Sequence, residues 1–306
     1  MKILFAGSPD SAAQILKNLA AQECEIVGVI SQPDKRSKRG GKKEPSAVSA
    51  EATKLGIPLY NPESIDDAFK QIIYPVNYDF LVVSAYGKIL PDWLLEHPEV
   101  APINIHFSLL PKYRGASPIQ SCLLNGDIKT GISIMKMTSG LDEGPVYSFH
   151  DHEIPYLSNK INLENQLTRL CNKILFKSLL DILNSSQKPV EQDHHSATYC
   201  NKITKSSGMV NFLEEEAEHI FRKFKALNGW PGLFFKRNNI DIKIHGMAVQ
   251  NPQIQEDMSD NFTFYKNGMT VKTLDSSIVI THLQFPGKKI ITAADAANSY
   301  AAFFAN

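Results

Sequence analysis

Short, fully apolar runs alternate with helical patterns through the first half of the chain. Between these runs, the apolar residues of Ser11–Gln22 recur at helical spacing, and Ser46–Leu55 reads as a helix that Ser46 caps and Gly56 ends. The strand-length runs are Lys2–Ala6, Ile26–Ile30, Phe80–Ser84 and Pro102–His106. Strands that are apolar on both faces are typical of a parallel sheet covered by helices. The alternation therefore predicts a doubly wound α/β domain.

The pattern changes near residue 185. Asn162–Leu183 has the amphipathic pattern of a long helix, whereas residues 185–208 are polar and contain Ser, Pro and Gly, so we expect a linker there. A helix is predicted at Glu214–Ala226. The strands predicted after it are Gly232–Phe235, Asp241–Val249, Asn261–Tyr265, Thr270–Thr273 and Ser277–Phe285. Such short strands, separated by turn signals, predict a small OB-like β-barrel.

The expected architecture is therefore α/β, with an N-terminal doubly wound, Rossmann-like parallel sheet and a C-terminal small β-barrel. We place the first domain at residues 1–184, the linker at 185–208 and the barrel at 209–306. A length of 306 residues, 43% of them hydrophobic and 21% charged, agrees with two globular domains.

Charge and cysteine content narrow the function classes. Lys and Arg total 32, as do Asp and Glu, so a protein that coats nucleic acid over its whole surface is disfavoured, although a local basic patch remains possible. The four cysteines are too widely spaced for a zinc motif, and reduced cysteines suit the cytoplasm. No apolar stretch reaches membrane-spanning length, and the N-terminal run resembles a buried strand more than a signal peptide. We expect a cytoplasmic protein without membrane contact.

Candidate chemistry lies at the end of the Pro102–His106 run. Asn104 and His106 are two positions apart, so their side chains share one side of the strand, at the edge where open parallel sheets bind ligands. Asp142 lies in the glycine-flanked segment SGLDEG. A carboxylate that meets His106 would orient the ring and stabilise its protonated form. By spacing alone, each residue also suits a structural role: a core histidine, a strand-end cap and a turn former.

Longer segments change this balance. NIHFSLLPKYRGASPIQ and SGLDEG, together with FAGSPD and LVVSAYGKILP, resemble the formyltransferase family that uses 10-formyltetrahydrofolate. The basic segment SQPDKRSKRGGKK and the later segments ALNGWPG and LQFPGKKIITAADAANS are similar to the members that act on methionyl-tRNA.

The resemblance implies transfer of the formyl group of 10-formyltetrahydrofolate to the free α-amino group of methionyl-initiator tRNA. It makes Asn104, His106 and Asp142 the catalytic residues. Acyl transfer of this kind passes through a tetrahedral oxyanion, to which the Asn104 amide and a protonated His106 can donate hydrogen bonds. One such donor is worth about 10² to 10³ in rate. Asp142 would keep His106 charged and aligned, and the reaction needs neither a metal nor a serine or cysteine nucleophile.

The resemblance also implies two binding regions. Folate binding would fall to Ser108, Leu109, Leu110, Pro111, Tyr86, Gly87, Ile89 and Leu90. The tRNA backbone would meet the basic loop, at Arg36, Lys38, Arg39, Lys42 and Lys43, with Arg39 the foremost candidate. A further candidate face for tRNA would comprise Lys202, Lys205, Arg222, Lys223, Lys243, Lys288 and Lys289. Arg114 has no assigned chemical role, and a monomer is expected.

Several alternatives stay open at this point. A sugar-nucleotide N-formyltransferase would share the three catalytic residues, the folate and a C-terminal barrel, but not the basic loop. A glycinamide ribonucleotide formyltransferase is usually shorter and has a Gly-rich turn where this chain has Gly7-Ser8-Pro9-Asp10. A deformylating hydrolase would use water as the acceptor. A Rossmann dehydrogenase needs the motif G-x-G-x-x-G after the first strand, where this chain has only Gly7. A tRNA-binding module without enzymatic activity would leave the three catalytic residues unexplained.

Overall fold

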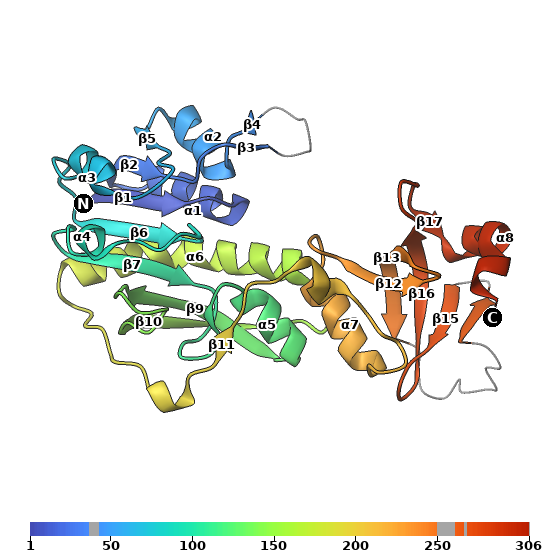
Figure 1. Ribbon diagram of the computed structural model, residues 1–306. Helices are drawn as coiled ribbons and strands as arrows, with labels where there is room; N and C mark the ends of the chain where they lie inside the picture. Colours follow the sequence, from blue (N-terminus) through green and yellow to red (C-terminus); the bar gives the residue numbers. More distant parts are fainter. Residues whose placement is uncertain (37–42, 250–260, 266–267, 306) are drawn as a thin grey trace. The chain divides into compact units, whose positions relative to one another are not determined.

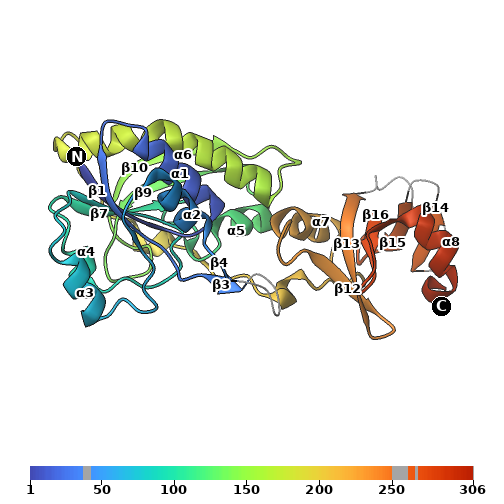
Figure 2. The same ribbon diagram turned by 90° about the horizontal axis from the view of Figure 1, so that it is seen from above.

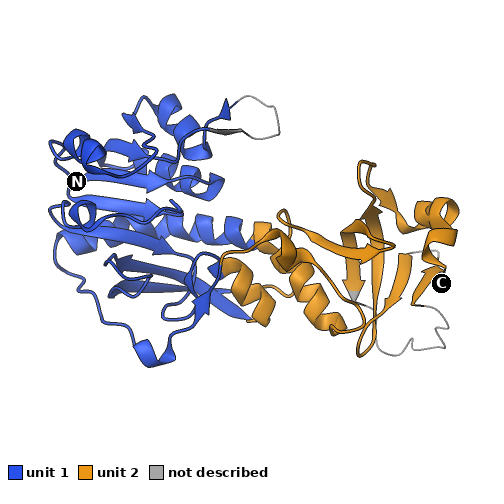
Figure 3. Ribbon diagram, in the orientation of Figure 1, with its two compact units in different colours: residues 1–118, 128–154, 163–201 blue, residues 119–127, 155–162, 202–306 orange. Residues whose placement is uncertain are grey.

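A computed structural model describes residues 1–36, 43–249, 261–265 and 268–305 of the protein (Figure 1). The chain divides into two compact units (Figure 3). The first comprises Met1–Pro118, Ile128–Ile154 and Leu163–Asn201, and the second comprises Ile119–Asp127, Pro155–Asn162 and Lys202–Asn306. Residues 185–201, in the segment expected to be a linker, thus belong to the first unit.

The first half of the chain contains most of the first unit's elements. They are β1 (Lys2–Gly7), α1 (Asp10–Ala20), β2 (Glu25–Ile30), β3 (Lys35–Arg36), β4 (Lys43–Glu44), α2 (Ala47–Leu55), β5 (Leu59–Tyr60), α3 (Asp67–Ile73), β6 (Phe80–Ser84), α4 (Asp92–Leu95), β7 (Ala101–His106), β8 (Arg114–Gly115), α5 (Pro118–Asn125), β9 (Lys129–Lys136) and β10 (Val146–Glu153).

The second half begins with the long helix α6. Its elements are α6 (Lys160–Leu183), η1 (His194–Ser196), β11 (Tyr199–Cys200), η2 (Lys205–Gly208), α7 (Ala217–Ala226), β12 (Leu233–Arg237), β13 (Ile240–Val249), β14 (Phe262–Tyr265), β15 (Gly268–Lys272), β16 (Ser277–Gln284), β17 (Ile291–Thr292) and α8 (Ala293–Phe304).

A seven-stranded sheet forms the first unit, in the order β10-β9-β7-β6-β1-β2-β5. Strands β5, β2, β1, β6 and β7 are parallel, which confirms the predicted α/β fold. Two further strands, which were not predicted, extend the sheet beyond β7: β9 pairs antiparallel with β7, and β10 pairs antiparallel with β9. The interior of β9 is one continuous buried run, which a hydrophobic pattern cannot distinguish from a buried helix.

Helices cover both faces of this sheet. Alternate residues of β1 and β6, such as Leu4 and Leu81, pack with Phe69 of α3 and Leu94 of α4 in one hydrophobic cluster. The other face carries α1 and α6 (Figure 2). The sequence signals of α2 are confirmed, because Ser46 Oγ accepts a hydrogen bond from the Ser49 amide at 2.9 Å and Gly56 ends the helix with φ 68°.

The second unit contains an antiparallel sheet in the order β12-β13-β16-β15-β14, with β17 paired to β16. This confirms the expected C-terminal antiparallel strands, with boundaries shifted by one or two residues. Its core is aromatic, with ring centroids of Phe212 and Phe235 at 5.1 Å and of Phe262 and Phe304 at 5.5 Å. Phe304 belongs to α8, which was not predicted although Thr292 and Asp295 form a capping box at its start.

In the described parts of the chain, no helix combines the length and the apolar character needed to cross a membrane.

Candidate active site

Loops that follow four neighbouring parallel strands gather at the carboxyl edge of the first unit's sheet. The loop after β6 contacts the loops after β1 and β2, because Ser8 Oγ and Gln32 Nε2 donate to the Tyr86 carbonyl at 3.4 and 2.6 Å. In the parallel register, Val83 of β6 lies opposite Asn104 of β7, so the end of β7 belongs to the same edge. This edge is the expected ligand-binding position of an open parallel sheet.

The three predicted catalytic side chains meet at this edge. Asn104 and His106 lie two residues apart on β7, and Asp142 lies in the loop between β9 and β10. Asn104 Nδ2 donates to Asp142 Oδ1 at 3.1 Å, and His106 Nδ1 lies 3.6 Å from Asp142 Oδ2. The Gly115 amide also donates to Asp142 Oδ2, at 2.8 Å. The carboxylate therefore contacts both predicted partners and is anchored by a backbone amide.

The second nitrogen of His106 fixes where the ring can carry its protons. His106 Nε2 lies 2.8 Å from the Tyr113 carbonyl oxygen, which can only accept, so Nε2 is the donor of this bond. Nδ1 then faces the Asp142 carboxylate. A proton on Nδ1 turns this approach into an ion pair, within a site where the side chains of His106 and Asp142 are only 6% and 15% exposed. The geometry therefore suits a protonated imidazole beside an ionised carboxylate.

The residues expected to bind folate are spread between the core and the surface. Tyr86 and Leu90 belong to the hydrophobic cluster on the β1–β6 face, and Leu110 packs with Met135 and Val146. Ser108 is buried and its hydroxyl donates to the Lys112 carbonyl at 2.6 Å. Of the remaining four, Leu109 and Pro111 are half-buried, and Gly87 and Ile89 are exposed.

Tyr86 combines burial with an unmet donor. Its side chain is 2% exposed, and its hydroxyl has no hydrogen-bond partner among the described residues. Burial raises the pKa of Tyr86 to about 12, since the phenolate would lose its hydration.

The expected tRNA-binding loop is described only at its base. Arg36 ends β3 and Lys43 begins β4, and the two residues pair in an antiparallel register. Lys38, Arg39 and Lys42 lie outside the described residues.

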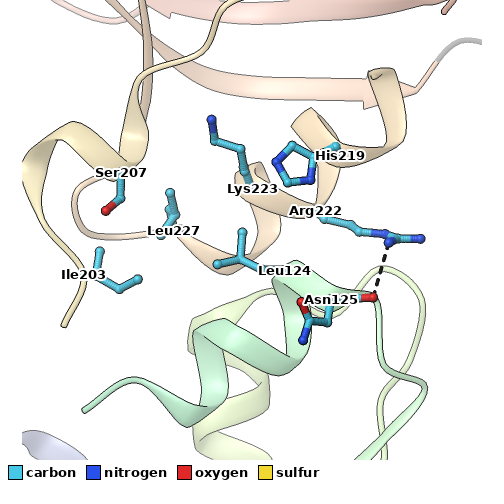
Figure 4. A pocket seen from close by; sticks show the side chains of 8 residues that line it. All are labelled: Leu124, Asn125, Ile203, Ser207, His219, Arg222, Lys223 and Leu227. Atoms are coloured by element: carbon cyan, nitrogen blue, oxygen red, sulfur yellow. Dashed lines mark hydrogen bonds between the residues drawn. The ribbon is translucent and has the colours of Figure 1, made fainter. Parts of the chain in front are cut away.

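The second unit contains a cavity of about 480 Å³ (Figure 4). It is lined by Leu124, Asn125, Ile203, Ser207, His219, Arg222, Lys223 and Leu227. Two of the lining residues, Arg222 and Lys223, were expected on a tRNA-binding face, yet both have carboxylate partners. Lys223 Nζ lies 2.7 Å from Glu215 Oε2, and Arg222 Nε lies 3.2 Å from Glu218 Oε1. This cavity contains none of the predicted catalytic residues.

Several residues around Asp142 had no assigned role in the sequence. They are Tyr113, Gly115 and Gln192, all within hydrogen-bond distance of His106 or of the Asp142 loop. Gln192 lies in the polar segment expected to be a linker, 50 residues beyond Asp142, and nothing in its local sequence marks it. Across the described residues, no three His, Cys, Asp or Glu side chains lie close enough to hold a metal ion.

Comparisons with known proteins agree with this geometry. The formyl transferase family model matches residues 1–179, and the formyl transferase C-terminal domain model matches residues 202–301. The chain is 38% identical over 303 residues to the methionyl-tRNA formyltransferase of Sulfurihydrogenibium sp. (strain YO3AOP1), covering 98% of this chain and 97% of that protein. It is 36% identical over 299 residues to the protein of the same name from Thermotoga maritima, covering 97% and 95%.

Solved structures share the fold at lower identity. The sugar 3N-formyl transferase WlaRD, crystallised with dTDP and 5-N-formyl-THF, gives a TM-score of 0.68 at 21% identity over 94% of this chain and 99% of that one. A methionyl-tRNA formyltransferase from Clostridium thermocellum gives a TM-score of 0.57 at 17% identity, covering 82% and 94%. Both halves of the chain thus match the same family, and the protein belongs to the formyl transferase family.

Proposed function

We propose that this protein transfers the formyl group of 10-formyltetrahydrofolate to the α-amino group of methionyl-initiator tRNA, giving N-formylmethionyl-tRNA. The observation that carries the proposal is the convergence of Asn104, His106 and Asp142 at the carboxyl edge of the sheet. Relatives 36–38% identical over nearly the whole chain are named methionyl-tRNA formyltransferases, which favours a tRNA acceptor over a sugar nucleotide.

The residue chemistry fits direct acyl transfer. The folate supplies an activated formyl group, and the chain supplies donors for the negative charge that develops on the formyl oxygen. Asn104 Nδ2 carries two hydrogens, of which one bonds Asp142, so the other is available to that oxygen. A proton on His106 Nδ1 provides the second donor, because the 3.6 Å separation from Asp142 Oδ2 is too long for a hydrogen bond and lets this N–H point at the formyl oxygen. Asp142 balances the His106 charge and accepts the proton that the attacking amine releases. The bond between the formyl carbon and N10 of the folate then breaks, and this proton passes to N10, which leaves as tetrahydrofolate.

Two features of the β6–α4 loop fit a flat heteroaromatic ligand. Ile89 is 92% exposed, and a bound ring system would cover this apolar side chain. Gly87 has φ 78°, a left-handed backbone conformation that favours glycine, and the absence of a Cβ leaves its backbone accessible to a ligand. We therefore assign folate binding to this loop with Ser108, Leu109, Leu110 and Pro111.

The acceptor is assigned to the basic loop and to the C-terminal domain. Arg36, Lys38, Arg39, Lys42 and Lys43 are clustered between β2 and α2, and cations grouped in this way favour contact with tRNA phosphates. Residues 209–306 form the second tRNA-binding part in this proposal. The enzyme acts as a monomer in the cytoplasm, where charged initiator tRNA is used.

The deciding experiment gives the full chain 10-formyltetrahydrofolate and one acceptor at a time: initiator methionyl-tRNA, elongator methionyl-tRNA, a dTDP-amino sugar, or water alone. We expect formyl-methionyl product with initiator tRNA. Turnover only with the sugar would replace the acceptor assignment, and tRNA binding without turnover would overturn the enzyme. Arg39→Ala should raise the KM for tRNA and leave the KM for folate unchanged.

A further inference from the structure

We propose that Gln192 and Arg114 are positioning residues that hold the Asp142 loop in its active arrangement. This inference rests on the proposed function, because it assigns a role in the same site. Both residues lie in the first unit, but they come from different parts of the chain. Arg114 belongs to β8, and Gln192 lies between α6 and β11.

Gln192 bonds the backbone of the loop on both sides of Glu143. Its Nε2 donates to the Asp142 carbonyl at 2.9 Å and to the Gly144 carbonyl at 2.6 Å, so both amide hydrogens are used. Gln192 is 7% exposed. Asp142 has φ 49°, a left-handed backbone conformation that residues other than glycine seldom adopt. A carboxamide that bridges two carbonyls is a means of holding this conformation.

Arg114 sets the direction of that carboxamide. Arg114 Nε and Nη2 donate to Gln192 Oε1 at 3.1 and 2.8 Å. A guanidinium only donates, so the atom it meets must be the oxygen, and the Gln192 NH2 group must turn toward the loop. Arg114 is 1% exposed, which makes the direction of this fork a fixed property of the fold.

The remaining contacts of Arg114 show why glutamine suits this position. Its guanidinium also contacts His194 Nδ1 at 3.2 Å and the Tyr199 hydroxyl at 3.4 Å, and none of its contacts in the described chain is a carboxylate. A glutamate at position 192 would be a stronger partner for a buried cation. It would not donate to the two carbonyls, however. Only the amide both accepts from Arg114 and donates to the loop.

The two ends of Asp142 are therefore fixed by neighbouring residues. Gln192 holds its main-chain carbonyl, and the amide of Gly115, which follows Arg114 directly, holds its carboxylate at 2.8 Å. Loss of the Gln192 donors should let the loop move, so that the carboxylate spends less time against His106. We therefore expect a lower rate of the chemical step and an unchanged affinity for folate.

Gln192→Glu tests this directly. The side chain keeps its size and its bonds from Arg114, gains an ion pair and loses both donors. We expect kcat to fall by about tenfold or more, with the KM for 10-formyltetrahydrofolate within about twofold. Tm should fall only modestly, because the ion pair with Arg114 offsets part of the two lost hydrogen bonds. Gln187→Glu is the matched control, because Gln187 Nε2 donates to the Tyr147 carbonyl outside the loop. Its kcat should stay within about twofold of the unmodified protein.

Hydrogen–deuterium exchange provides a readout that needs no turnover. The Gly115 amide, which donates to Asp142 Oδ2, should exchange faster in the Gln192→Glu variant but not in the Gln187→Glu variant. Gln192→Met, uncharged and of similar length, should give the same result if the glutamate variant does not fold. Unchanged kcat and unchanged exchange would overturn the positioning role. An unmodified protein that transfers no formyl group would overturn the proposed function instead, and exchange would still test the positioning.

Discussion

Asp142 is the residue on which the candidate site depends most. Its carboxylate accepts from Asn104 and from the Gly115 amide and lies against His106, while its own carbonyl accepts from Gln192. The position of Asn104 and His106 on the same side of β7 was predictable, because side chains two residues apart on a strand point to the same side. The contact with Asp142 was expected from the family resemblance, since no local pattern reports an approach between residues 38 positions apart.

Replacement of Asp142 by Asn should remove the negative charge beside His106 while keeping the size of the side chain. We expect kcat to fall by about 10² to 10³, the worth of one oxyanion donor, because His106 loses the anion that favours its proton on Nδ1. The KM for folate should change little. Glu143→Gln is the control, since Glu143 is the exposed neighbour and undergoes the same chemical change. Equal losses in both variants would contradict the assignment.

The buried phenol of Tyr86 leads to a prediction about alkaline stability. The raised pKa, about 12 against the ordinary value of 10.0, means that the folded state keeps a proton that the unfolded state loses first. This contribution to stability is complete below pH 10 and is lost as the pH rises toward 12. Tyr86→Phe should therefore make the alkaline decline shallower.

At pH 7 the same variant should be as stable as the unmodified protein or more so, because it removes a buried hydroxyl that has no partner in the described chain. Denaturant titrations at several pH values measure both effects. A loss of more than about 1 kcal/mol at pH 7 would show that the hydroxyl makes a stabilising contact.

At the scale of elements, strength of local signal decided what could be predicted. Parallel strands with continuous apolar runs and the capped helix α2 were visible in the sequence. The strands β8 and β11 were not, because two residues are too few to show a period. They pair across 85 positions of the chain, with Tyr199 opposite Arg114 and Cys200 opposite Gly115. Their pairing is fixed by tertiary contacts alone, which also explains why Gln192 was missed.

The pairing of β8 with β11 predicts an unusually large loss of folding stability for Gly115→Ala. Gly115 has φ 121°, and a Cβ there would clash with the Cys200 carbonyl oxygen. Gly56→Ala isolates the backbone effect, because Gly56 also has a positive φ, 68°, with nothing within 4 Å of its Cβ position. We expect about 1 kcal/mol of lost stability for Gly56→Ala and clearly more for Gly115→Ala, measured by urea unfolding. Similar losses would contradict the close approach.

At the scale of the whole molecule, charge is balanced but unevenly distributed. Net charge is zero, so attraction to tRNA must come from local groups, and the group proposed for it is the basic loop between β2 and α2. The location of this loop was readable from the sequence, whereas its three central cations, Lys38, Arg39 and Lys42, lie outside the described residues.

Salt dependence should expose this local attraction. Each phosphate contact contributes about 0.7 to 0.9 to the slope of log Kd against log salt. Replacing Arg36, Lys38, Arg39, Lys42 and Lys43 by alanine should make the slope for charged tRNA shallower, while the KM for folate stays independent of salt. An unchanged slope would place the phosphate contacts elsewhere on the chain.

The segment around β11 belongs to the first unit, and this restricts where two chains of this family can be joined to make a hybrid protein. The two family matches leave a gap from residue 180 to 201, which invites a crossover anywhere inside it. A hybrid joined at the start of this gap would inherit Asp142 but not Gln192, Thr198 or Cys200, and Thr198 bonds the amide of Tyr113, the residue that faces His106. The catalytic half is portable to a new acceptor domain only when the junction lies beyond Asn201.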